Sequence, residues 1–429
     1  MKVNFILDLL YIVLMTFQKL TKALMFGRDR SLTSLLNDTF IRGILFQALI
    51  AIGLLLSINW LADNTLSNLA NQGKTLGFDF LTRTAGFQIS PTLGTWMLDY
   101  KVGKSTYTDV YLIGIINTFI VALLGILAAT VIGFTVGIMR LSDNLVFRWF
   151  SSFYVEVVRN VPLLLQLFFW YFAVLRAMPS KREKLELVEG VAGLNITGLY
   201  LPAPIVSDGF IYSFLSLIGA IAITFLVRRY ALRRQAETGQ ILPMFWIGLG
   251  IIISLPVLVH YLNGSPLDWS LPEFKDTGPK LRQGYQSGAG MVLVPEMLAV
   301  WLALSLYTAA FIAEIVRAGI LAVNRGQTEA AYALGVRPNV TLRLVVIPQA
   351  MRVIIPPLTS QYLNLTKNSS LAVAIAYPEL VSVFAGTALN QVGKEVEMIF
   401  MMMMVYLTFS LMTAAFMNWF NSRVKLVER

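Results

Sequence analysis

The chemically active side chains of this 429-residue sequence are few. It contains no cysteine and a single histidine, His260. This excludes thiolate metal sites, cysteine nucleophiles and histidine-cluster metal sites, and it argues against a histidine-based triad. Gly73-Lys74-Thr75 and Gly103-Lys104-Ser105 match the end of a phosphate-binding loop, but both lack the earlier glycine that the motif requires. We therefore predict no metal site and no cofactor in this chain.

Two Glu-x-x-Arg pairs stand beside apolar runs. Glu156 with Arg159, and Glu314 with Arg317, are spaced i, i+3, so each pair can neutralise itself on one helix face. We favour a structural role for both pairs, at the end of a helix or at a subunit interface.

A polar helical face lies within an otherwise apolar stretch. Gln361, Asn364 and Asn368 are spaced i, i+3 and i+7, which places them on one side of a helix. Lys367 lies beside them, and an ionisable group at membrane depth usually faces a cavity or a partner. Hydrogen bonding between helices is the alternative role for this face.

The composition indicates a membrane protein. Hydrophobic residues make up 56% of the chain and charged residues 14%, against about 25% charged residues in soluble domains. A spanning helix needs about 20 mostly apolar residues, and eight stretches meet or approach this length. They are Gly43–Leu61, Leu112–Met139, Trp149–Leu175, Phe210–Val227, Ile241–Leu262, Pro295–Val316, Val353–Ala372 and Met398–Phe420.

The distribution of charge orients these spans. The net charge is +10, which fits either nucleic acid or an anionic membrane face. With both termini in the cytoplasm, the inner loops carry the positive excess, including Arg228, Arg229, Arg233 and Arg234, and the outer loops are slightly negative. This asymmetry supports eight spans with both ends inside, and it removes nucleic acid as a partner.

The loop after the sixth span contains a short candidate helix. Thr328 can cap it, Glu329 suits the positive end of its dipole, and Gly335 can end it in the left-handed conformation. Two turns of helix are unstable alone in water and need a surface to dock against. From the residues alone, this helix is either a docking element for a partner protein or a connector between spans.

This loop resembles the EAA loop of bacterial ABC importer permeases. The matching pattern is Glu329-Ala330-Ala331, three residues, Gly335, nine residues, Val345, one residue, then Ile347-Pro348. Val345 and Ile347 stand where isoleucine and leucine are commoner. Three further segments resemble the polar amino-acid (His/Glu/Gln/Arg/opine) branch of that family: Tyr154–Pro162, Ala313–Gly319 and Leu365–Leu371. The extra length is similar to the permease of general L-amino acid importers.

The resemblance implies an all-α, polytopic fold of about eight transmembrane helices. A type I importer permease core is expected, with N-terminal and central extra spans. Five segments are expected: residues 1–42, cytoplasmic with a possible interfacial helix; 43–111, an extra span and external loop; 112–178, the first part of the core; 179–294, an insertion with two further spans; and 295–424, the second part of the core with the EAA loop at 324–348.

The resemblance also implies partners and a location. The chain would be a non-catalytic subunit in the bacterial inner membrane, with both termini cytoplasmic. A second permease subunit, two ATPase subunits that bind ATP and Mg, a periplasmic amino-acid-binding protein and membrane lipid would surround it. An ion-gradient-driven amino-acid transporter is the alternative, and it would need carboxylates in mid-span.

Site residues follow from the resemblance. Coupling to the ATPases is expected at Glu329, Ala330, Ala331 and Gly335. A zwitterionic amino acid needs polar partners inside the membrane, so the candidates for the substrate path are Gln361, Asn364, Lys367, Asn368, Ser369 and Ser370. Binding of the substrate carboxylate is the alternative role for Arg159 or Arg317.

Overall fold

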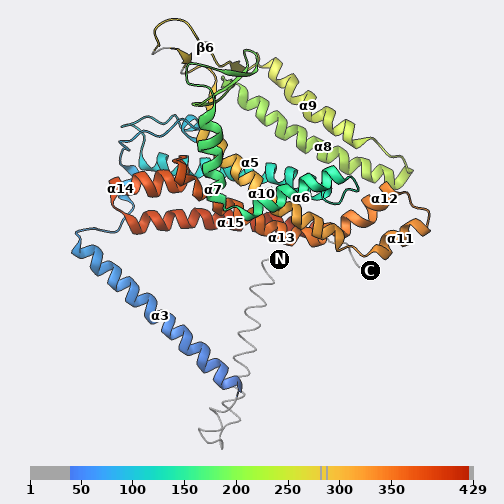
Figure 1. Ribbon diagram of the computed structural model, residues 1–429, viewed down its shortest axis with the longest axis horizontal. Helices are drawn as coiled ribbons and strands as arrows, with labels where there is room; N and C mark the ends of the chain where they lie inside the picture. The colour runs from blue at the N-terminus through green and yellow to red at the C-terminus, as the bar shows by residue number, and fades with distance from the viewer. Residues whose placement is uncertain (1–38, 281–282, 287, 425–429) are drawn as a thin grey trace, which may run out of the picture. The chain divides into compact units, whose positions relative to one another are not determined.

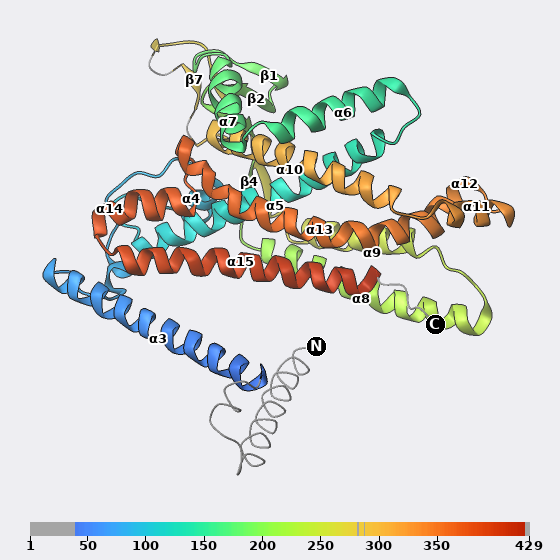
Figure 2. The same cartoon turned by 60° about the horizontal axis from the view of Figure 1, so that its bottom comes forward.

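The computed structural model describes residues 39–280, 283–286 and 288–424 in two units. The first unit ends at Leu76 and contains helix α3 (Thr39–Asn71), which includes the predicted span Gly43–Leu61. The interfacial helix predicted near the N-terminus lies outside the described residues. The second unit begins at Gly77 and contains the remaining elements (Figures 1 and 2).

Two long helices form the centre of the second unit. Helix α5 (Tyr107–Met139) begins at a capping box, in which the backbone N–H of Thr106 donates to Oδ2 of Asp109 at 2.7 Å. Helix α10 (Pro295–Leu321) begins with a proline. Proline is well suited to this position, because the N–H that it lacks would have no acceptor within the first turn of the helix. The two helices pack along their lengths because α5 carries glycines at the contact. A Cβ added at Gly133 would lie 2.6 Å from Cβ of Ile312.

The predicted third span, Trp149–Leu175, is two helices rather than one. Helix α6 (Leu145–Asn160) and helix α7 (Leu163–Phe168), which continues through η2 (Phe169–Val174) and η3 (Leu175–Ala177), meet at 107°. Pro162 causes the break, because the residue before a proline is held out of the helical region, and Val161 is extended (φ −95°, ψ 128°). The side chain of Gln166 donates to the carbonyls of Val158 and Val161, at 2.8 and 2.9 Å, and satisfies part of the freed backbone.

The C-terminal third runs through a series of helical segments. They are α11 (Arg325–Ala333), α12 (Pro338–Thr341), η5 (Leu342–Val346), α13 (Ile347–Asn368), η6 (Ser369–Ile375), η7 (Val381–Ala388), α14 (Leu389–Val392) and α15 (Glu395–Val424). Pro356 and Pro357 lie inside α13 without ending it. Helices α5, α7, α10, α13 and α15 share the main hydrophobic core.

The insertion contains a helical hairpin and small antiparallel sheets. Helices α8 (Phe210–Thr238) and α9 (Met244–Leu262) pack side by side (Figure 1). The strands are β1 (Leu185–Val188), β2 (Ala192–Asn195), β3 (Gly198–Leu201), β4 (Ala203–Val206), β5 (Leu267–Ser270), β6 (Phe274–Lys275), β7 (Gly284–Tyr285) and β8 (Met291–Leu293). Because β4 pairs with β5 and β3 with β8, the two loops that flank the hairpin are joined to each other.

The described residues contain seven helices that are long and apolar enough to cross a membrane, or up to eight if the bent α6–α7 pair counts as one. The prediction of a mostly helical protein with about eight spans is therefore confirmed. The small sheets were not foreseen, because the loops that contain them have no strand periodicity longer than four residues. Two short helices precede α5: η1 (Asp79–Thr82) and α4 (Leu93–Met97).

Candidate functional site

Helix α11 occupies the loop that resembles an EAA motif. The predicted cap at Thr328 was wrong, because the first helical residue is Arg325, four residues before Glu329, which a cap at Thr328 would place first. Glu329 therefore lies beyond the first turn of the helix. Asn324 is the N-cap, and its side-chain oxygen accepts a hydrogen bond from the N–H of Gly326 at 2.8 Å. Asparagine and threonine are both good caps, and Asn324 leaves room for one more turn of helix.

Gly335 ends this helix as predicted. Its φ is +74°, a left-handed conformation that glycine adopts without a steric cost. The N–H of Gly335 donates to the carbonyl of Tyr332 at 2.9 Å, and the N–H of Val336 donates to Ala331 at 3.0 Å. This pair of bonds is the Schellman motif, which fixes the direction of the chain after the helix.

Most of α11 is open to its surroundings. Ala331 is buried against the rest of the chain, whereas Glu329 and Ala330 are exposed. Tyr332 and Leu334 are 49% and 83% exposed, and neither lies in a candidate span. Two large apolar side chains at the end of this helix are thus exposed in a segment outside the candidate spans.

Helix α13 carries the polar face predicted from the sequence. Its opposite side is buried, and the hydroxyl of Tyr362 lies 2.7 Å from Oγ1 of Thr130 on α5. Asn364 and Lys367 are exposed, and Gln361 and Asn368 are half-buried. Within the part of the chain that the structure describes, these four side chains form no hydrogen bonds or ion pairs.

The two serines differ from the rest of the predicted path. Ser369 is buried, and its hydroxyl donates to the carbonyl of Thr366 at 2.7 Å. The hydroxyl of Ser370 donates to the carbonyl of Lys367 at 2.8 Å. Both hydroxyls therefore satisfy the backbone where α13 changes to the 3₁₀ helix η6, and the open polar face consists of Gln361, Asn364, Lys367 and Asn368.

Glu314 is the centre of a charged cluster that joins three helices. On its own helix, Nη2 of Arg317 donates to Oε1 of Glu314 at 2.6 Å. Arg140, at the end of α5, donates to Oε2 of the same carboxylate, and Nη1 of Arg159 on α6 lies 3.7 Å from it. Three guanidinium groups thus surround one carboxylate, and the predicted pair Glu314–Arg317 is part of a larger set that includes Arg140.

The other predicted pair does not form on one helix face. Glu156 is exposed, and within the described residues no basic side chain lies within ion-pair distance of it. Arg159 instead turns toward α10, where its guanidinium lies 5.0 Å from the ring centroid of Phe311. The shared carboxylate and the aromatic ring on α10 hold Arg159 away from Glu156.

Comparisons with known proteins agree on one family. A family model described as the inner membrane component of binding-protein-dependent transport systems matches residues 213–426. The chain is similar to the general L-amino acid transport system permease protein AapQ of Rhizobium johnstonii, with 45% identity over 418 residues that cover 97% of this chain and 100% of AapQ. It is 48% identical over 396 residues to YhdX of Escherichia coli K12, covering 92% of this chain and 97% of YhdX.

The chain belongs to this family of transport-system permeases. A third relative, the glutamate/glutamine/aspartate/asparagine permease protein BztB of Rhodobacter capsulatus, is 37% identical over 430 residues that cover 93% of this chain and 97% of BztB. The resemblance drawn from the EAA-like loop is thereby confirmed at the level of the family. The protein is a non-catalytic, multi-pass component of the inner membrane.

The permease also contains a buried polar network that the sequence did not point to. Glu379 is 1% exposed, and its carboxylate accepts hydrogen bonds from the N–H groups of Val381 and Ser382, both at 2.8 Å, and from the hydroxyl of Tyr406 at 3.1 Å. Asn117 on α5 is buried too, and its amide donates to the carbonyl of Pro378 at 2.7 Å. These bonds attach the turn between η6 and η7 to α5 and α15. The signal in the sequence is a lone glutamate after proline, which is too weak to predict the network.

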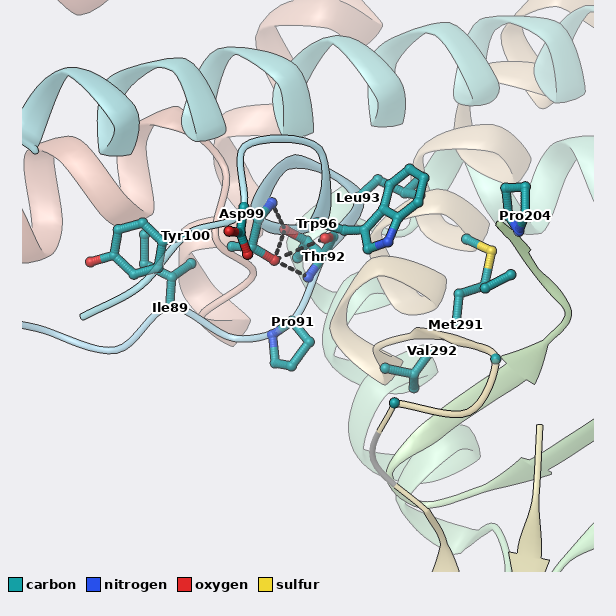
Figure 3. A pocket seen from close by; sticks show the side chains of 14 residues that line it. Ile89, Pro91, Thr92, Leu93, Trp96, Asp99, Tyr100, Pro204, Met291 and Val292 are labelled. Atoms are coloured by element: carbon teal, nitrogen blue, oxygen red, sulfur yellow. Dashed lines mark hydrogen bonds between the residues drawn. The ribbon is translucent and has the colours of Figure 1, made fainter. Parts of the chain in front are cut away.

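A cavity of about 530 Å³ opens where the segment around α4 meets the insertion (Figure 3). Its walls are largely apolar and include Trp96, Pro204 and Met291. Asp99 is the charged side chain of this lining, and it is paired with Lys101. Tyr100 donates to the carbonyl of Phe87 at 2.7 Å, and burial raises the pKa of its hydroxyl. Among the residues that the structure describes, the lining of this cavity therefore contains no unpaired charged side chain.

Proposed function

We propose that this permease is the membrane-spanning subunit of an ATP-driven importer of amino acids. The named relatives that it matches over nearly their whole length include transport proteins for amino acids. Its partners would be a second permease subunit in a heterodimer, two ATPase subunits, and an amino-acid-binding protein outside the membrane. Both termini would be cytoplasmic.

The exposed surface of α11 carries this proposal. Leu334, 83% exposed, and Tyr332 form an apolar patch beside Glu329 and Ala330 on a helix that lies outside the candidate spans. A helix of nine residues gains little stability on its own. A groove on an ATPase subunit would cover the patch, and the small alanine side chains would allow the helix to fit into that groove. Movement of the ATPase would then reach the spans through the rigid turn at Gly335.

We infer that the amino acid passes along the open face of α13. Gln361, Asn364 and Asn368 offer amide donors and acceptors to the ammonium and carboxylate groups of a zwitterion, and Lys367 adds a positive charge. Ser369 and Ser370 would act indirectly, by stabilising the end of the helix. Contact with the second permease is the competing role for this face.

We favour a structural role for the arginines around Glu314. Arg140, Arg159 and Arg317 all engage a carboxylate of the chain itself. A substrate carboxylate would have to compete with Glu314 for these guanidinium groups, which already join α5, α6 and α10. The cluster therefore fits a brace between helices better than a substrate site.

Reconstitution tests the proposed function directly. The complete complex should take up labelled amino acids into vesicles only when ATP, the ATPase subunits and the binding protein are all present. Uptake by this chain alone, driven by a sodium or proton gradient, would overturn the proposal in favour of a secondary transporter.

The coupling turn can be tested separately by replacing Gly335 with aspartate. At φ +74° any L residue is strained, and a negative charge at the C-terminal end of α11 also opposes the helix dipole. We expect transport to fall by about five- to thirtyfold, given about 1–2 kcal/mol of combined strain and charge, while the complex still assembles. Gly335→Asn is the matched control, because asparagine has the same shape and the same backbone cost at this φ but adds no charge. Transport equal to wild type in Gly335→Asp would contradict the docking assignment.

A further inference from the structure

Four arginines near the end of α8 have no role in the proposed transport path. Arg228, Arg229, Arg233 and Arg234 are all exposed. In the part of the chain that the structure describes, no carboxylate lies within ion-pair distance of any of them. Arg229 lies 5.8 Å from the ring centroid of Phe225, and Nη2 of Arg234 donates to Oε1 of Gln240 at 3.2 Å. The positive charge of this group is therefore not neutralised within the described chain.

The position of the arginines along α8 matches the edge of a bilayer. The uncharged part of the helix, residues 210–227, is about 27 Å long at 1.5 Å per residue, close to the roughly 30 Å of the hydrocarbon core. The arginines follow directly and occupy about 9 Å of helix length. This corresponds to the polar headgroup layer on one side of the membrane, which is roughly 5–8 Å thick.

The arginines surround the helix rather than forming a stripe. At about 100° per residue, their side chains are spread over about 240° of the circumference. The remaining gap contains Ala231, which is 4% exposed. A protein that bound one side of α8 would reach only some of these four arginines. A layer of headgroups meets all of it.

Helix α9 places aromatic side chains near the same level. A Cβ added at Gly248 would lie 2.9 Å from Cγ2 of Thr224, which sets the register of the hairpin. The two helices run in opposite directions, so Met244, four residues before Gly248, lies level with Arg228, four residues after Thr224. Trp246 lies about half a turn closer to the Gly248–Thr224 contact, which is deeper in the hairpin. Phe245 and Trp246 are 71% and 69% exposed. Exposed tryptophan just inside a belt of arginine is typical of a membrane interface.

We propose that Arg228, Arg229, Arg233 and Arg234 form a binding collar for the phosphate headgroups of anionic lipids. The guanidinium groups would donate charge-assisted hydrogen bonds to lipid phosphates. Trp246 would anchor the neighbouring helix at the same depth. The insertion would thus hold a ring of anionic lipid beside the permease core, whichever solute the core transports.

Lipid enrichment tests the collar. The full complex is delipidated and equilibrated with mixed micelles of detergent and phosphatidylcholine that contain a minor fraction of phosphatidylglycerol. It is then re-isolated, and its bound lipids are measured by mass spectrometry. We expect bound phosphatidylglycerol to exceed its share in the micelles. Changing all four arginines to glutamine should lower this enrichment by about threefold or more, and added salt should lower it in wild type.

Two matched variants make the result decisive. Changing the four arginines to lysine keeps the charge and should preserve most of the enrichment. Changing Lys101, Lys104, Arg182 and Lys280 to glutamine removes the same charge from other exposed loops and should leave the enrichment unchanged. Equal phosphatidylglycerol in wild type and in the arginine-to-glutamine variant would overturn the proposal. Loss of a protein subunit with no change in lipid would assign the collar to a protein partner instead.

Discussion

Helices α10 and α9 are equally apolar but have opposite surroundings. Their most apolar windows have mean hydropathies of 1.9 and 2.0. Yet 61% of that window is buried in α10, against 6% in α9. Hydropathy therefore identifies both helices as candidate spans but does not distinguish a helix at the centre of the bundle from one that is exposed at its periphery.

Small residues at the contacts account for the difference. Lipid is as apolar as a leucine side chain, so helices in a membrane associate where small residues allow close packing. In the centre, Cβ atoms at Gly133, Gly137 and Gly319 would each lie less than 3 Å from a neighbouring helix. In the α8–α9 hairpin only Gly248 has such a contact among the described glycines, whereas Gly219 and Gly250 have no atom within 4 Å.

Replacing a glycine by leucine should give the largest difference in stability between the central helices and the hairpin. Gly133→Leu forces a side chain against Ile312, whose Cβ lies 2.6 Å from the new Cβ position. We expect the folded state to lose about 3 kcal/mol or more, at the upper end of typical overpacking costs, and the yield of monodisperse protein to fall sharply. Gly250→Leu is the control and should unfold at or slightly above the wild-type midpoint, because its Cβ position is open and leucine is a better helix former than glycine. Equal midpoints for the two variants would mean that α5 and α10 are not in close contact.

Substitutions of Glu314 and Glu156 should also differ in their cost to stability, because Glu314 contacts other helices and Glu156 is exposed. Glu314→Gln leaves Arg140, whose side chain is only 13% exposed, without its carboxylate. Because Glu314 itself is 27% exposed, we expect a loss of about 1–3 kcal/mol, below the 3–5 kcal/mol of a fully buried pair. Glu156→Gln should cost less than about 0.5 kcal/mol, since Glu156 is exposed. Thermal unfolding of both purified variants measures the difference, and equal losses would contradict the three-helix brace.

The sequence predicted those structural features, such as spans and helix ends, that depend on residues close together in the chain. The apolar runs gave the spans, and Gly335 gave the end of α11, because a left-handed turn requires a residue without a Cβ. The break at Val161 follows from Pro162, a local signal that the predicted span Trp149–Leu175 did not use. The start of α11 was wrong because Asn324 and Thr328 are both acceptable caps.

Contacts between distant residues could not be predicted in this way. Strand β3 pairs with β8, some 90 residues later in the chain, and strands of two to four residues show too little alternation to be recognised. The cluster around Glu314 includes Arg140, which the sequence assigns to a loop. Glu379 is stabilised largely by backbone N–H groups, and these groups leave no trace in the residue types.

The smallest expected effect lies at the one tight contact of the hairpin. Gly248→Ala places a methyl group 2.9 Å from Cγ2 of Thr224. Thr224 cannot rotate away freely, because its hydroxyl donates to the carbonyl of Ala220 at 2.8 Å, a bond worth about 1 kcal/mol. Alanine is also a better helix former than glycine by about 1 kcal/mol. The two terms oppose each other, so we expect a net change below about 1 kcal/mol.

A second background separates these two terms. Thr224→Ser removes the methyl group that obstructs the new alanine and keeps the hydroxyl. In that background Gly248→Ala should stabilise the protein by up to about 1 kcal/mol, since the gain in helix propensity is no longer opposed. Thermal unfolding of wild type, the two single variants and the double variant completes the cycle. If the effect of Gly248→Ala were the same with threonine and with serine, α8 and α9 would not meet at this pair, and the alignment of the arginine collar with Trp246 would fall with it.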